Sequence, residues 1–129
     1  MTTNRKRLVR KHTDLEVYQR AYAIAMKLFF LSRKFPKEEM YLTSQIRRSS
    51  RSVCSNITEA WRKRRYEGSF ISKLSDSEAQ AAETQSWIQF AVGCEYLAAE
   101  EAKPLYLEYE AILAMLVDMI FHANRWTLK

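Results

Sequence analysis

Apolar residues recur every three or four positions along most of the chain, which is the spacing of one face of an α-helix. The stretch 45–65 shows this pattern most clearly and contains neither glycine nor proline. Its apolar seam consists of Ile46, Ser50, Val53, Ile57 and Ala60 or Trp61. At about 100° per residue, a set of arginines falls on the opposite side of the helix: Arg47, Arg48, Arg51 and Arg62. The stretch therefore predicts a helix with an apolar seam and a cationic stripe.

A first helix is predicted over residues 14–34. Thr13 and Glu16 have the S/T-x-x-E spacing of a capping box, in which each side chain bonds the other residue's backbone amide. Pro36 ends the helix, because the residue before a proline is pushed out of the α region. The predicted apolar stripe of this helix consists of Leu15, Tyr18, Tyr22, Ala25 and Phe29.

The second helix is expected to open at Lys37 and to include the stretch described above. Gly68 and Ser69 indicate the next break, with Ser69 as a plausible N-cap. A third helix then runs to about Tyr96, with Trp87 and Phe90 lying off its main stripe. That stripe consists of Phe70, Leu74, Ala81, Ile88 and Ala91.

The fourth helix is predicted to begin near Glu100, because Pro104 is tolerated only in a first turn. It carries two neighbouring apolar stripes, more than a small bundle needs, and excess apolar surface suggests self-association. The first stripe consists of Leu105, Tyr109, Ile112, Leu116 and Met119. The second consists of Tyr106, Leu113, Val117 and Ile120.

Four helices joined by short loops predict an all-α fold, an antiparallel up-down-up-down four-helix bundle. No alternating strand pattern competes with this interpretation. Residues 13–129 form one predicted domain, in keeping with a total length of 129 residues. Residues 1–12 are expected to be a disordered basic arm.

Charge is divided unevenly along the chain. Residues 1–65 carry 17 lysines and arginines against 5 acids, a net charge of +12. Residues 66–129 carry 4 basic and 10 acidic residues, a net charge of −6, which together reproduces the overall +6. The first half therefore suggests a polyanionic partner. Equally, the two halves can attract each other, within one protomer or between protomers.

The residues that catalysis or metal binding would need are sparse. His12 and His122 are the only histidines, and neither has a metal ligand at a recognised spacing. Glu59 and Glu83 are a possible metal pair across the core, although di-iron bundles also use histidines. Glycine-rich phosphate loops and nucleophile motifs are absent from the sequence. We therefore expect no enzyme activity, no metal and no cofactor.

The sequence carries no stretch of about 18 apolar residues that would cross a membrane, and we expect no membrane partner. The basic N-terminus lacks the apolar region of a signal peptide, so a cytoplasmic location is expected. Cys54 and Cys94 lie inside helical patterns and are expected to be free thiols.

Two segments of the predicted second helix are specific in sequence: residues 42–50, LTSQIRRSS, and residues 53–60, VCSNITEA. Residues 14–19, DLEVYQ, residues 35–39, FPKEE, and the region 83–85 accompany them. Together these segments, which cover roughly residues 13–97, resemble the family of bacterial 23S rRNA-intervening sequence proteins.

The resemblance implies an antiparallel bundle that assembles into a pentameric barrel. It also points to a related branch, the accessory variability proteins of diversity-generating retroelements, which are basic and bind nucleic acid and a reverse transcriptase. We therefore expect an oligomer that binds RNA or an RNA–DNA species without strong sequence specificity, with a reverse transcriptase or another protein as a possible partner. The alternative is a homo-oligomeric protein-interaction scaffold whose arginines contact other subunits or a partner. The candidate nucleic-acid-binding residues are Arg47, Arg48, Arg51, Arg62, Lys63, Arg64 and Arg65.

Overall fold

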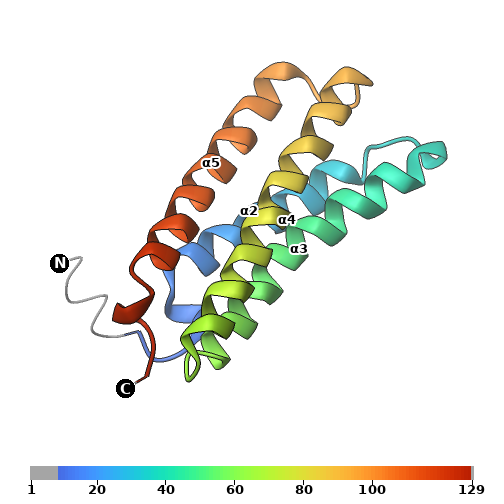
Figure 1. Ribbon diagram of the computed structural model, residues 1–129. Coiled ribbons are helices and arrows are strands. Elements are labelled where there is room, and N and C mark those ends of the chain that lie inside the picture. Colours follow the sequence, from blue (N-terminus) through green and yellow to red (C-terminus); the bar gives the residue numbers. More distant parts are fainter. Residues whose placement is uncertain (1–8, 129) are drawn as a thin grey trace.

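The computed structural model describes residues 9–128, which form four α-helices and three short 3-10 turns. The helices are α2 (Glu16–Ser32), α3 (Met40–Arg62), α4 (Glu67–Gly93) and α5 (Ala99–Phe121). The 3-10 turns are η1 (His12–Asp14), η2 (Lys37–Glu39) and η3 (Ala123–Arg125). Consecutive helices run in opposite directions, and no strand occurs within residues 9–128 (Figure 1). The predicted all-α four-helix bundle is confirmed.

The core contains the seams predicted for the last three helices. On α3, Ile46, Val53 and Ile57 are fully buried, and the first stripe of α5 is buried throughout. All five predicted stripe residues of α4 are likewise buried. Trp87 is half-buried and Phe90 is exposed, as expected of residues that lie off that stripe.

The stripe predicted for the first helix is wrong at its three aromatic positions, whereas Leu15 and Ala25 are buried as predicted. The residues of α2 that enter the core are Val17, Ala21, Ile24, Ala25, Leu28 and Ser32. Of the predicted residues on the helix itself, only Ala25 is buried, whereas Tyr22 is 53% exposed. Aliphatic residues one position away from the aromatic ones fill the core. The side chains of Tyr18 and Phe29 are half-buried, and that of Tyr22 is exposed.

Several predicted helix boundaries are also wrong. Leu15 is the N-cap of α2 and no side chain caps this helix, so the Thr13–Glu16 capping box does not form. The α3 helix begins at Met40, after η2, and α4 begins at Glu67, which places Gly68 and Ser69 inside the helix.

The α4–α5 end of the bundle departs from prediction in two ways. The α4 helix ends at Gly93 instead of Tyr96, because Glu95 has a positive φ of 65° and reverses the chain. Pro104 lies in the second turn of α5, which begins at Ala99. The missing amide of this proline therefore removes one hydrogen bond inside the helix.

Small and hydroxyl side chains join α3 to α4, the pair of helices with the most extensive contact. The buried Ser77 hydroxyl donates to the Val53 carbonyl at 2.8 Å. The buried Thr84 hydroxyl lies 2.8 Å from the Ser49 hydroxyl. Side chains this short allow two helices to approach closely, and their hydroxyls find partners inside the core.

The contact between α2 and α5 is less extensive than those of the other neighbouring helices. Arg20 of α2 links this helix to α5, because its Nε and Nη2 each donate a hydrogen bond to Glu108 at 2.8 Å. This forked hydrogen bond lowers the pKa of the Glu108 carboxyl and raises that of the Arg20 guanidinium. A bidentate ion pair thus holds α2 against α5.

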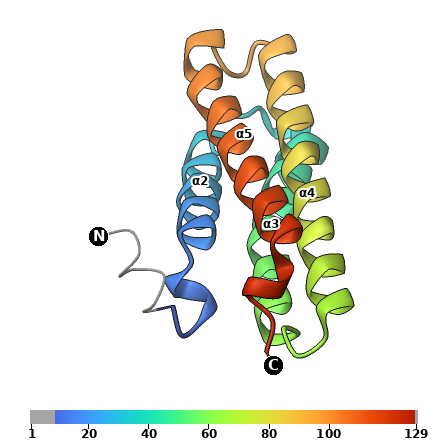
Figure 2. The ribbon, with the colours of Figure 1, turned by 60° about the vertical axis from the view of Figure 1, so that its left-hand side comes forward.

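The described part of the chain begins and ends at the same end of the bundle, which also holds the α3–α4 connection (Figure 2). Residues 1–8 of the predicted arm lie outside the described part of the chain. Within the rest of the arm, Val9 packs against the core, and the Arg10 and Lys11 amides donate to the Asp14 carboxylate at 2.9 and 3.2 Å. None of the helices within residues 9–128 is long and apolar enough to cross a membrane.

Candidate functional site

A groove of about 950 Å³ is lined by the last residue of α2, the α2–α3 connection and α3 from Met40 to Ser55. Five basic side chains line it together with five serines and threonines, and none of its lining residues is acidic. The cations are Arg33, Lys37, Arg47, Arg48 and Arg51. We call this surface the arginine groove. Its chemistry suits an anion, because every ionic side chain is positive and the hydroxyls can donate hydrogen bonds.

Arg47 is held in place inside the arginine groove. Its Nε donates to the Ser32 hydroxyl at 2.8 Å, and its guanidinium lies 4.7 Å from the centre of the Phe29 ring. The exposed Arg51 guanidinium approaches the same ring at 5.9 Å. Stacking on an aromatic ring restricts an arginine without neutralising its charge. Phe29 therefore orders two cations that keep their positive charge available.

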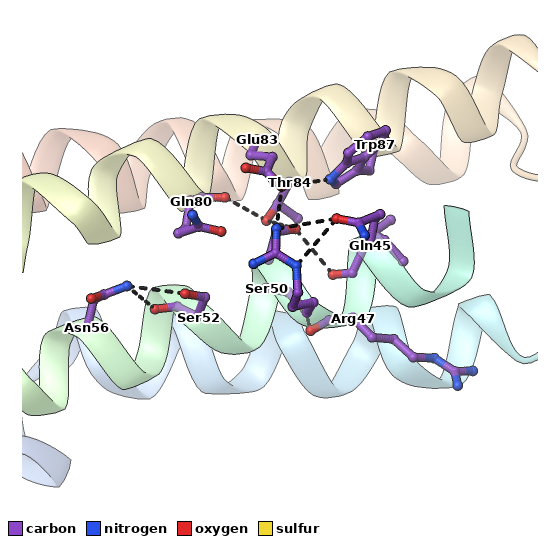
Figure 3. A network of polar contacts seen from close by, with 12 residues as sticks. Gln45, Arg47, Ser50, Ser52, Asn56, Gln80, Glu83, Thr84 and Trp87 are labelled. Atoms are coloured by element: carbon purple, nitrogen blue, oxygen red, sulfur yellow. Dashed lines mark hydrogen bonds and ion pairs between the residues drawn. The ribbon is translucent and has the colours of Figure 1, made fainter. Parts of the chain in front are cut away.

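Arg48 differs because its charge is already paired. Its Nη2 donates to Glu83 Oε2 on α4 at 2.9 Å, and the side chain also reaches Gln45. The Trp87 indole donates to the same carboxylate oxygen at 3.3 Å. Figure 3 shows Glu83 and Trp87 facing Gln45 across the α3–α4 contact. Arg48 thus contributes less net positive charge to the groove than Arg51 does.

The cluster formed by Arg62, Lys63, Arg64 and Arg65 lies elsewhere, at the C-terminal end of α3 and in the connection to α4. Arg64 stacks 3.7 Å above the Trp61 ring, and its Nε donates to the Trp61 carbonyl at 2.8 Å. The other three side chains are exposed. Arg51 and Arg62 are separated by about 17 Å along the helix axis. The structure therefore divides the predicted basic residues into two groups.

Sequence reasoning missed Arg33 and Lys37, which join the arginine groove from the segment between α2 and α3. The predicted antiparallel topology could have indicated their position. Antiparallel neighbours bring the end of one helix beside the start of the next, so cations at that connection must lie near Arg47. Neither Arg33 nor Lys37 forms an ion pair within residues 9–128.

The hypothesis of a metal site between Glu59 and Glu83 is wrong. Glu59 pairs with Lys73 at 2.8 Å near one end of α4, whereas Glu83 pairs with Arg48 about 15 Å further along that helix. No cluster of three or more histidine, cysteine or acidic residues suited to a metal occurs within residues 9–128. Asn56 bonds only within its own helix among the contacts described, to Ser52 (Figure 3).

Comparison with known proteins places the chain among proteins of related sequence and fold. A search of curated proteins finds no match. The crystal structure of a protein of unknown function from the S23 ribosomal protein family of Bacteroides thetaiotaomicron is similar, with a TM-score of 0.73 and 25% sequence identity. That match covers 81% of this chain and 97% of the other. A model of the 23S rRNA-intervening sequence protein family matches residues 13–118. The chain therefore belongs to the 23S rRNA-intervening sequence protein family.

Proposed function

We propose that this protein binds nucleic acid, without enzyme activity, through the arginine groove. One observation carries the proposal: five basic residues line a single groove whose lining contains no carboxylate. Arg33, Lys37 and Arg51 have no ion-pair partner within the described chain, so an external anion can neutralise them.

Contacts to the phosphate backbone would supply most of the affinity. Each lysine or arginine that neutralises a phosphate releases condensed counterions, which makes binding favourable and sensitive to salt. Phosphate contacts carry no base information, so binding of this kind has little sequence specificity. The groove hydroxyls, which include those of Thr43 and Ser44, would add neutral hydrogen bonds to phosphate oxygens.

The family relation names no activity. The family takes its name from an intervening sequence in 23S rRNA, and the similar crystal structure is of a protein of unknown function. A reverse transcriptase remains a proposed partner, supported by the resemblance to accessory variability proteins alone. The proposal of nucleic-acid binding therefore depends on the groove.

Replacing Arg33, Lys37 and Arg51 together with alanine is expected to weaken nucleic-acid binding and flatten its dependence on salt. Loss of three phosphate contacts should reduce the slope of log K against log salt by about 2–3. The measurement is fluorescence anisotropy with a labelled RNA between about 50 and 200 mM salt. The matched control replaces Arg62, Lys63 and Arg65, which removes the same charge from the other basic group.

Equal losses of RNA affinity in the two variants would contradict binding at the arginine groove. They would indicate attraction to the overall positive charge of the protein. No binding by the unmodified protein at about 50 mM salt would contradict the proposed function itself. The scaffold alternative would then be preferred. Arg48 is the candidate that contributes least to either function, because it already pairs with Glu83 of its own chain.

We also propose that the protein is a homo-oligomer, and a pentamer by resemblance. Exposed apolar side chains follow α5, where Leu107 is 54%, Val117 49% and Phe121 82% exposed. Large exposed apolar side chains gathered on one helix are typical of a protein contact. Light scattering at tens of micromolar protein is expected to give about five times the 15.3 kDa protomer mass. Replacing Val117 and Phe121 with glutamate should lower that mass, and a monomeric unmodified protein would contradict the proposal.

A further inference from the structure

A second groove, of about 500 Å³, continues from the arginine groove along α2 and α3. Arg51 and Ser55 line both, so they form one continuous surface. The second groove is mainly apolar. Its lining residues on α2 are Tyr18, Tyr22, Ala25 and Met26. We call this part the tyrosine groove.

The two tyrosines of this groove form an aromatic surface that is open to solvent. Their ring centres lie 6.4 Å apart, with an angle of 19° between the ring planes. Tyr18 is half-buried and also meets the edge of the His12 ring, whereas Tyr22 is 53% exposed. The inner tyrosine is therefore fixed by packing, and the outer one offers its ring to a ligand.

One carboxylate lines the tyrosine groove, that of Glu59. It is paired with Lys73 of α4 at 2.8 Å, and this contact lowers the pKa of the carboxyl. Its negative charge is thus largely balanced from outside the groove. The cation that lines the tyrosine groove is Arg51, at the junction of the two grooves. A ligand crossing that junction meets positive charge on one side and aromatic surface on the other.

The arginine groove and the tyrosine groove together extend over a length that suits a polymer. Thr43 and Thr58, which line the two ends on α3, are about 22 Å apart along the helix axis. A stacked strand advances by about 3.4 Å per nucleotide, so several nucleotides fit. Duplexes keep their bases inside the helix, whereas a single strand can place a base on an aromatic ring while its phosphates contact arginine.

We propose that the ligand of this surface is a single-stranded segment of nucleic acid, with phosphates in the arginine groove and at least one base stacked on Tyr22. This inference rests on the proposed function and adds the strandedness of the ligand. It also gives a role to Tyr18 and Tyr22, whose side chains are not fully buried in the core.

Replacing Tyr22 with alanine is expected to weaken binding of a single-stranded 12-nucleotide RNA by roughly 5-fold to 100-fold, the range for loss of one stacking aromatic. Affinity for a 12-base-pair RNA duplex should change less than about twofold, because phosphate contacts remain. Tyr22→Phe keeps the ring and should retain single-strand affinity. An abasic strand of the same length should bind the unmodified protein and the Tyr22→Ala variant equally.

The outcomes separate this inference from the proposed function. If the Tyr22→Ala variant binds the single strand as tightly as the unmodified protein, while the Arg33, Lys37 and Arg51 variant does not, the stacking inference fails and the proposed function stands. If the unmodified protein binds no probe, both fail. A lower mass by light scattering for Tyr22→Ala, with loss of both ligands, would make the tyrosine groove a subunit contact and overturn the inference.

Discussion

Replacing Tyr109 with alanine is expected to lower the free energy of unfolding by about 3–5 kcal/mol, the range for large aromatic residues in cores. Tyr109 lies on α5 and is fully buried in the core to which all four helices contribute. Its removal leaves a cavity that the surrounding helices can fill only in part. Urea unfolding at one fixed protein concentration measures the change, because subunit association would make apparent stability depend on concentration.

Tyr109→Phe is the matched control, because the Tyr109 hydroxyl has no hydrogen-bond partner within the described structure. Removing an unsatisfied buried hydroxyl is nearly neutral or stabilising. A loss above about 1.5 kcal/mol in Tyr109→Phe would indicate that the hydroxyl makes a valuable hydrogen bond.

The buried Tyr109 phenol also makes the free energy of unfolding depend on pH in the alkaline range. Burial raises the pKa of the Tyr109 phenol far above its ordinary value of 10.0, so the folded protein keeps the proton. The unfolded chain loses that proton above about pH 10, which favours unfolding as pH rises. Other tyrosines and lysines titrate in the same range. The comparison with Tyr109→Phe isolates this contribution, which is about 1.4 kcal/mol per pH unit above pH 10.

Ala81→Leu is expected to destabilise the protein by about 3 kcal/mol, through overpacking of the α3–α4 contact. Ala81 is fully buried on α4. One turn to either side, Ser77 and Thr84 each touch α3 through a 2.8 Å hydroxyl contact. There is consequently no room for three more carbon atoms unless the helices separate and both hydroxyl contacts are lost.

Ala82→Leu is the control for this second prediction, because it makes the same chemical change one residue away, where the side chain is exposed. Its effect should stay within about 0.5 kcal/mol. Thermal unfolding followed by circular dichroism compares the two variants. Similar melting temperatures for Ala81→Leu and Ala82→Leu would show that α3 and α4 do not pack as closely as described.

The set of residues that line the arginine groove illustrates a limit of reasoning from sequence alone. Helical periodicity placed Arg47, Arg51 and Arg62 on one side of α3, because that side depends only on residue spacing. Periodicity carries no information about the neighbouring helix. Arg33 joins the groove, and Arg64 instead stacks on Trp61, through contacts that only the tertiary arrangement creates.

The first helix shows the same limit for the core. Its sequence offers two apolar stripes, one aliphatic through Ile24 and one aromatic through Tyr22, and periodicity alone cannot rank them. The structure buries the aliphatic stripe, which leaves the tyrosines at the groove. Tyr22, the residue proposed to stack on a base, is therefore one whose burial was predicted incorrectly.

The sequence by itself determined the fold class, the seams of α3, α4 and α5, and the family, because each depends on residue order along one chain. The tertiary structure decided which stripe of α2 is buried, where the helices begin, and which cations share a groove. These features depend on competition between alternatives of similar local energy, such as the capping box at Thr13 and the observed start at Glu16. Packing against distant segments resolves that competition, because tertiary contacts outweigh differences in local propensity.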